Sequence, residues 1–329
     1  MKKTLIALAV LGAVAGVAQA QSAVTVYGAL DVGVSKTTNG TTTMGAGDNN
    51  KLGFKGVEDL GGGLAATFQA EIRFDPDTGT VEAGARPLFQ GESRVGLQGA
   101  FGHVRLGRGL TAMQAGAAAF DPWSANRARG TYVPGIMQAG YNSTPLEGSD
   151  PRSNTGNRFS NAVFYNSPVI SGFQGNLTVA SKEDGTVPNL HASAVPVSAS
   201  GTYNNGPVGA MLAFERNALD DRFSQIAGSY SVGPAKLMAS YAQTKFAAND
   251  SKTTGWLIGA NVVTGPGKLL LGYGQKKSDL VGQTAIKQAA IGYEYPLSKR
   301  TYLYTDAKNV RHSGHDTLNT FDVGIHHNF

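Results

Sequence analysis

Short segments with alternating residue character fill most of this chain, and they constrain its fold more than any other feature. The stretch that begins at Val24, VTVYGALDVGVSK, alternates apolar with small or polar residues. It is longer than most strands of globular proteins and suits a tilted strand that crosses a bilayer. Beyond residue 20, no apolar run reaches the length that a membrane helix needs. The chain is therefore predicted to be all-β.

Long and short connections take turns between these segments. Residues 36–50 form a long polar connection, whereas residues 58–63 (EDLGGG) form a tight turn between segments 51–57 and 64–74. Short turns at one end and long loops at the other are typical of outer-membrane barrels. Together with 24–36, these segments make sixteen predicted strands, the others being 90–99, 102–108, 158–166, 173–182, 191–203, 207–216, 222–232, 236–246, 254–263, 268–276, 285–295, 301–311 and 318–329.

The last strand separates apolar from polar side chains by face. Phe321 and Val323 share one face with the terminal Phe329, whereas Asp322 and His326 lie on the other. A soluble sandwich also alternates, so this pattern alone does not decide between the two classes. Strand length, loop asymmetry and the terminal Phe favour a membrane barrel, and sixteen strands leave an aqueous lumen.

The first twenty residues have the features of a secretory signal peptide. Lys2 and Lys3 precede the apolar stretch 4–17, and the small-x-small sequence AQA at 18–20 is a cleavage site. We predict a cleaved leader at 1–20 and one barrel domain at 21–329. Removal of the two leader lysines lowers the formal net charge from +5 to +3, too mild to indicate nucleic-acid binding. The absence of cysteine means that no disulfide stabilises the fold.

Residues 109–157 are too long and too irregular for a hairpin connection. The first part (GLTAMQAGAAAFDPWSANRARG) is small and apolar, and the second (TYVPGIMQAGYNSTPLEGSDPRSNTGN) is rich in Gly, Pro, Ser and Asn. Loops longer than about 12–15 residues are usually functional or disordered. We expect part of this loop to fold into the lumen and narrow it.

Several motifs resemble the Gram-negative general porin family, in its β-proteobacterial branch. They occur in family order over nearly the whole chain, at 24–34 (VTVYGALDVGV), 50–64 (NKLGFKGVEDLGGGL), 99–108 (GAFGHVRLGR), 293–301 (YEYPLSKRT) and 323–329 (VGIHHNF). The resemblance implies a sixteen-stranded antiparallel transmembrane barrel, a homotrimer in the Gram-negative outer membrane, whose third external loop constricts the lumen. Ions and small hydrophilic solutes would diffuse through it.

The resemblance also implies partners. Phe329 resembles the aromatic end that the barrel-assembly machinery reads, and outer-membrane lipid and lipopolysaccharide would surround the barrel. No cofactor, metal site or catalytic residue is expected.

The constriction residues follow from the same resemblance. Lys51 and Arg158 match basic wall positions, and Glu71 matches a lumen acid. Arg73 is two residues from Glu71 and therefore shares its face. Asp121, in FDPW, matches the acid of the constriction loop. Charged groups on the narrowest ring decide the ion selectivity of a pore, and here we predict modest anion selectivity.

One wall position departs from the family. The family has an Arg where this chain has Gly91, and Arg94 follows three residues later. Regular alternation would point Arg94 toward lipid, although a bulge or a snorkelling side chain would return it to the lumen. Arg127 and Arg129 on the long loop either supply the missing charge or are solvated outside. Both alternatives stay open.

Three other functions compete with a diffusion channel. An outer-membrane barrel enzyme of the phospholipase kind needs a Ser–His pair at a lipid-facing rim. A structural or adhesive barrel would have a plugged lumen, and a secreted β enzyme would purify without detergent. The G-x-S-x-G motif of one hydrolase class is absent, since GESRVG has Val95 at the second glycine position.

Overall fold

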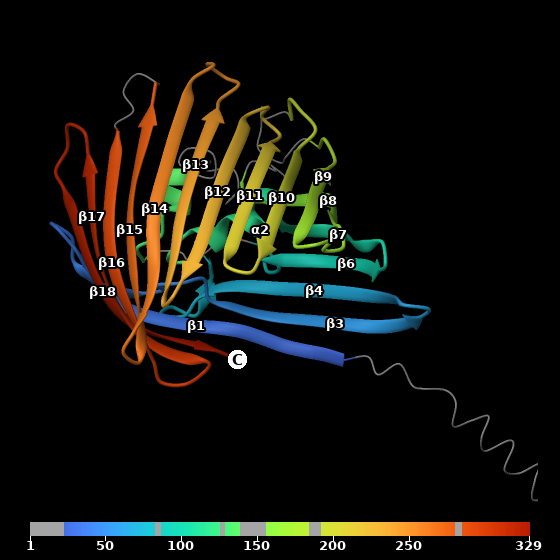
Figure 1. Ribbon diagram of the computed structural model, residues 1–329, viewed down its shortest axis with the longest axis horizontal. Coiled ribbons are helices and arrows are strands. Elements are labelled where there is room, and N and C mark those ends of the chain that lie inside the picture. Colours follow the sequence, from blue (N-terminus) through green and yellow to red (C-terminus); the bar gives the residue numbers. More distant parts are fainter. Residues whose placement is uncertain (1–22, 83–86, 126–128, 139–155, 184–191, 280–284) are drawn as a thin grey trace, which may run out of the picture.

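Sixteen antiparallel strands close into a barrel in the computed structural model, which describes residues 23–82, 87–125, 129–138, 156–183, 192–279 and 285–329 (Figure 1). Two of the 18 hydrogen-bonded strands, β2 (Thr42–Gly45) and β5 (Thr80–Val81), are short additions, which leaves 16 in the wall. The barrel closes because β1 (Ala23–Thr37) pairs with β18 (Leu318–Asn328) as well as with β3 (Lys51–Gly61). The predicted sixteen-stranded antiparallel barrel is confirmed.

The other wall strands follow chain order around the barrel. They are β4 (Leu64–Asp75), β6 (Glu92–Gly99), β7 (Gly102–Leu110), β8 (Arg158–Asn166), β9 (Phe173–Ala180), β10 (Val197–Asn205), β11 (Val208–Arg216), β12 (Arg222–Val232), β13 (Ala235–Lys245), β14 (Lys252–Thr264), β15 (Gly267–Ser278), β16 (Ile286–Pro296) and β17 (Thr301–His312). No helix among the described residues is long and apolar enough to span a membrane. The predicted leader lies outside the described residues.

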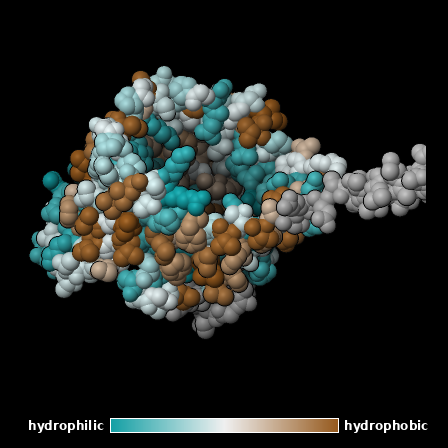
Figure 2. All heavy atoms as spheres, turned by 90° about the horizontal axis from the view of Figure 1, so that it is seen from below, coloured by the Kyte–Doolittle hydropathy of each residue, from teal (hydrophilic) through white to brown (hydrophobic). Residues whose placement is uncertain are grey.

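The two faces of the wall differ in polarity, as the alternation predicted. On β18, Phe321 and Val323 are exposed outward, whereas Asp322 and His326 are buried inside the barrel. Figure 2 shows the resulting surface, with hydrophilic side chains around a central hollow and hydrophobic ones gathered on the outside. An apolar exterior band with a polar interior is the pattern of a transmembrane barrel.

One predicted turn is shorter than expected. The predicted start of the turn at residues 58–63 was wrong, because β3 continues to Gly61 and Glu58 still pairs with Ala66 of β4. Gly62 and Gly63 make the reversal with φ angles of 62° and 79°. Residues with a Cβ rarely adopt this left-handed region, which explains the glycine run.

Part of the long loop lies inside the barrel. Residues 111–125 and 129–138, here called the inward segment, contain α2 (Ala112–Ala117), η2 (Ala118–Phe120) and the one-turn π-helix η3 (Val133–Met137). Its apolar side chains and inward apolar residues of β11 to β16 form the main hydrophobic core. In Figure 1, α2 lies beside β10 and β11, which it contacts. The described part of the loop thus packs on the inner face of the wall, and the predicted narrowing of the lumen stays a prediction.

Candidate functional site in the barrel interior

Wall hydroxyls hold the start of the inward segment. The backbone N–H of Ala112 donates to Thr178 Oγ1 at 3.1 Å, and that of Met113 donates to Ser198 Oγ at 3.0 Å. Ser200 Oγ donates in turn to the carbonyl of Ala112 at 2.9 Å. The first N–H groups of a helix have no partner within the helix. Here β9 and β10 each supply a hydroxyl acceptor for one of them. This explains the Ser and Thr residues on the inward faces of those strands.

Arg129, the first residue of the second part of the inward segment, ties that segment to β16 and β17. Its Nε lies 2.5 Å from Asp306 Oδ2, and its Nη1 lies 3.1 Å from Glu294 Oε1. Trp123 Nε1 also donates to Asp306, at 2.6 Å. The Arg129 side chain is 1% exposed. Arg129 is therefore an anchor for the inward segment. The sequence analysis had left open two other roles, a charge in the constriction or a solvated position outside.

Glycines on the wall make room for the inward segment. A Cβ at Gly272 of β15 would lie 2.5 Å from the Tyr132 ring, and one at Gly274 would lie 2.9 Å from it. Real Cβ atoms do not approach other heavy atoms that closely, so the fit depends on these two glycines. This segment and this wall are complementary in shape.

Asp121 occupies a different position from the one expected for a constriction acid. It is 2% exposed, and it accepts hydrogen bonds from Thr131 Oγ1 and the backbone N–H of Tyr132, both at 2.7 Å. The backbone N–H groups of Trp123 and Val133 donate to it as well. Burial raises the pKa of the Asp121 carboxyl, and these donors lower it in part. Its carboxylate joins the two halves of the inward segment instead of facing open lumen.

A group of ionised side chains lines the opposite wall, on β3, β4 and β6. Lys51 is directly across the ladder from Arg73, and Arg73 Nε lies 2.8 Å from Glu71 Oε1. Tyr27 Oη donates to Glu71 Oε2 at 3.0 Å. Lys51, Glu71 and Arg73 thus share one face, which the spacing predicted for Glu71 and Arg73 and the family resemblance predicted for Lys51.

Arg94 faces the barrel interior. Regular alternation counted from Gly91 pointed it toward lipid, which is the wrong face. Gly91 precedes β6, and a Cβ on it would lie 2.6 Å from Glu71 Oε1. The next residue, Glu92, is also inward, paired across the ladder with Glu71. Two successive inward residues shift the alternation by one. Arg94 then points inward with its guanidinium 2.8 Å from Glu92.

Arg158 reaches the backbone at Gly91. Its Nε donates to the carbonyl of Gly91 at 2.7 Å, and its Nη1 donates to Asn157 Oδ1 at 3.1 Å. The guanidinium therefore lies against the backbone of Gly91, which has no side chain. Arg127, the remaining expected residue, lies outside the described residues.

Two inward basic residues were missed by the sequence analysis. Lys55 shares the inward face of β3 with Lys51, and Arg105 is paired with Gly96 on the inward face between β6 and β7. Counting in steps of two along the strand from Lys51 would have placed Lys55 on the same face. Lys55 and Arg105 line a hollow of about 280 Å³ together with Arg94.

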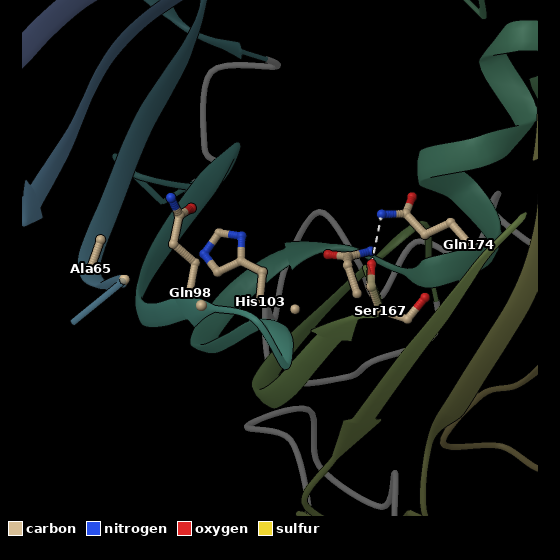
Figure 3. Close-up of a pocket in the computed structure, with 9 residues that line it drawn as sticks. Ala65, Gln98, His103, Ser167 and Gln174 are labelled. Carbon is tan, nitrogen blue, oxygen red and sulfur yellow. Dashed lines mark hydrogen bonds between the residues drawn. The ribbon is translucent and has the colours of Figure 1, made fainter. Parts of the chain in front are cut away.

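A larger hollow of about 660 Å³ continues along the same wall. Gln98 and His103 are cross-strand partners in it, and Figure 3 shows them together, with Ser167 and Gln174 further along. Gln174 Nε2 donates to the carbonyl of Ser167 at 3.0 Å. His103 and Gln98 border both hollows, so this wall offers polar groups along much of its length.

Acidic residues gather on the far side of the interior, on β17, β18 and β1. Asp31 is fully buried and accepts from Tyr304 Oη at 2.8 Å. His326 Nδ1 lies 3.0 Å from Asp31 Oδ2. Asp306, 1% exposed, holds Arg129. These acids are buried among partners, whereas the basic wall lines open hollows.

Comparison with known proteins places the whole chain in one family. A family model described as Gram-negative porin matches residues 7–315. Outer membrane porin protein 32 of Delftia acidovorans is 33% identical over 99% of this chain and 94% of the relative. An outer membrane porin protein of Bordetella pertussis is 27% identical over the full length of both chains.

Solved structures agree with the fold. An anion-selective porin from Comamonas acidovorans superimposes with a TM-score of 0.81 and 26% identity, covering 94% of this chain and 100% of that one. A trimer form of OmpT of Vibrio cholerae superimposes with a TM-score of 0.70 over 94% of this chain and 99% of that one. At 14% identity, this second likeness concerns the fold alone.

Proposed function

This chain belongs to the Gram-negative porin family, and we propose that it forms a weakly anion-selective, water-filled channel for ions and small hydrophilic solutes. Its relatives are outer membrane porins, and the chain is an outer-membrane barrel of the same kind. A porin conducts by passive diffusion, so the function depends on the shape and charge of the lumen and needs no covalent chemistry.

One observation carries the anion preference. The inward faces of β3, β4, β6 and β7 carry more cations than anions. These four strands are neighbours in the wall, so the cations lie close to one another. The cations are Lys51, Lys55, Arg73, Arg94 and Arg105, and the anions are Glu71 and Glu92 in mid-wall with Asp59 and Asp75 near the strand ends. A wall with one sign of charge and low-dielectric surroundings concentrates counter-ions.

The inward segment would narrow the lumen toward this wall. It packs against the opposite side of the barrel, on β9 to β17, through the contacts of Ala112, Met113 and Arg129. The narrowest ring would then include Lys51, Glu71, Arg73 and Arg158, with Arg127 on the same loop. Asp121 supports the ring by holding the segment together, since its own carboxylate is buried.

The assembly and export of the protein are part of the same proposal. The named trimer form of OmpT supports a homotrimer for this chain as well. The leader at 1–20 would direct export and be removed. The terminal Phe329 would be read by the barrel-assembly machinery, and lipid and lipopolysaccharide would surround the barrel.

The test is the reversal potential of single channels in a planar bilayer under a salt gradient. The wild-type potential should have the sign of anion preference. The double variant Lys55→Glu/Arg105→Glu should move it toward cations, because both residues line the same hollow. The control Lys252→Glu changes an exposed residue at the end of β14 and should leave the potential unchanged.

Other outcomes separate the parts of the proposal. Wild-type conductance with cation preference would contradict the selectivity but keep the channel. Absence of conductance from folded, detergent-purified protein would contradict the channel and favour a plugged barrel. Hydrolysis of lipid by that preparation would favour the enzyme.

A further inference from the structure

The hollow of about 660 Å³ lies at the end of the barrel interior where the short turns are. Of the residues that line it, Gly63 is in the turn after β3, Gly102 begins β7, and Ser167 directly follows β8. In outer-membrane barrels the short turns are on the periplasmic side. A solute that has passed the narrowest ring from outside would therefore meet this hollow before it leaves the channel.

The lining of this hollow is polar but carries no fixed charge. Among the described residues that line it, none is Asp, Glu, Lys or Arg. Arg105 lines the neighbouring hollow, and its guanidinium donates to Asn166 Oδ1. Asn166 Nδ2 donates in turn to Asn176 Oδ1, so this amide is held between the two strands beside it. The basic wall therefore ends where the neutral hollow begins.

Side chains that line the hollow are held by one atom and leave another for a solute. His103 Nε2 shares a hydrogen bond of 2.9 Å with Thr67 Oγ1, which leaves Nδ1. Gln174 Nε2 donates to the carbonyl of Ser167 at 3.0 Å, which leaves Oε1. Gln98 is the cross-strand partner of His103, and Figure 3 shows the two side by side. Groups that are positioned in advance cost less to order when a ligand binds.

The floor of the hollow has few side chains. A Cβ at Gly102 would lie 2.2 Å from the carbonyl oxygen of Asn166, and one at Gly99 would lie 2.9 Å from the Phe101 ring. The packing of the wall thus requires glycine at both positions, and Ala65 adds only a methyl group to the lining. The volume is within the range of about 300–1,000 Å³ that is usual for small-molecule sites. A small solute can therefore lie against bare backbone with amides around it.

We propose that this hollow is a weak, transient binding site for an uncharged polyhydroxylated solute of monosaccharide size. The inference rests on the proposed channel function and names a solute class for it. Hydroxyl groups both donate and accept hydrogen bonds, as the amides of Gln98 and Gln174 and the ring of His103 do. A charged solute would lose hydration here without meeting a counter-charge. A site along a channel must also release its solute, which a few neutral hydrogen bonds allow.

The experiment measures single-channel conductance in a planar bilayer while glucose is added, with a polyethylene glycol of similar mass as the reference solute. Glucose should lower the wild-type conductance in a saturable way, whereas the polymer, whose ether oxygens only accept, should act through bulk conductivity alone. Gln98→Leu/Gln174→Leu should raise the glucose concentration needed for half of the effect by about tenfold, because hydrogen-bond partners are lost. The matched control is Ser229→Val/Ser231→Val, which changes polar residues at the same end of β12 and should respond as the wild type does.

A second variant tests the hollow without removing a polar group. Ala65 is the cross-strand partner of Gln98, and Ala65→Leu fills the floor beside it. This variant should also weaken the glucose effect, with the reversal potential unchanged because no charge is altered.

Three outcomes would overturn the proposal. The first is an equal glucose response in the wild type and in Gln98→Leu/Gln174→Leu, and the second is a conducting wild type with no saturable response. Either would leave the channel function intact. The third, absence of all conductance from folded protein, would overturn the channel itself and with it the site as a position along the solute path.

Discussion

Two sides of the same barrel interior use charge in opposite ways. On β3 to β7, cations such as Lys55 and Arg105 border hollows with few acids beside them. On β16 to β18 and β1, buried acids such as Asp306 and Asp31 are matched by Arg129, His326 and tyrosine hydroxyls. A charge with a nearby partner holds structure, whereas a charge that faces water shapes the field for solutes. Residue type alone does not distinguish the two.

The largest effect should come from breaking the buried anchor. Arg129→Met leaves Asp306 and Glu294 without their guanidinium in an interior where Asp306 is 1% exposed. Removal of one partner of a buried ion pair typically costs about 3–5 kcal/mol. Denaturant unfolding in detergent should show this loss, with noisier single-channel currents as the inward segment detaches.

Arg222→Met is the control for that variant. The Arg222 side chain is 56% exposed and lies 3.6 Å from Asp220, and exposed pairs contribute about 0–1 kcal/mol. Equal destabilisation by the two substitutions would contradict the anchoring role of Arg129.

A smaller loss should follow from Asp121→Asn. The amide keeps the size of the side chain but replaces one acceptor oxygen by a donor, while four hydrogen-bond donors still face it. An unsatisfied buried group costs about 1–3 kcal/mol, which thermal unfolding should detect. The reversal potential should not move, because this carboxylate does not face the lumen. A shift toward anions would return Asp121 to the pore ring.

Truncation of the basic ring should change selectivity more than stability. We expect Lys51→Ala/Arg158→Ala to reduce the anion-to-cation permeability ratio a few-fold, which corresponds to about 1 kcal/mol or less. Both side chains lie near the Glu71–Arg73 pair and Gly91. Lys245→Ala/Lys252→Ala removes the same charge from the outer rim and serves as control. An unchanged ratio would remove Lys51 and Arg158 from the ring.

The smallest effect should be that of salt on the wild type. The Debye length falls from about 10 Å at 0.1 M to about 3 Å at 1 M, so the permeability ratio should approach unity as both reservoirs become more concentrated. Reversal potentials at a fixed concentration ratio and rising total salt measure this. A ratio independent of salt would mean that selectivity depends on direct binding and not on the field of the basic wall.

The sequence by itself determined the architecture of this protein. Alternation along segments such as 24–36, and the regular exchange of long and short connections, specify an antiparallel barrel because a strand has a period of two residues. Motifs in family order identified the porin family. The same period placed Arg73 on the face of Glu71, since both lie within one regular ladder.

Only the tertiary structure decided which charges face water. Arg94 changed face because the alternation shifts between Gly91 and Glu92, and nothing in the local sequence marks that shift. Arg129 became an anchor because its partner Asp306 is 177 residues away in the chain. The partner of a buried charge is set by which distant strands the fold brings together, and local periodicity carries no information about that pairing.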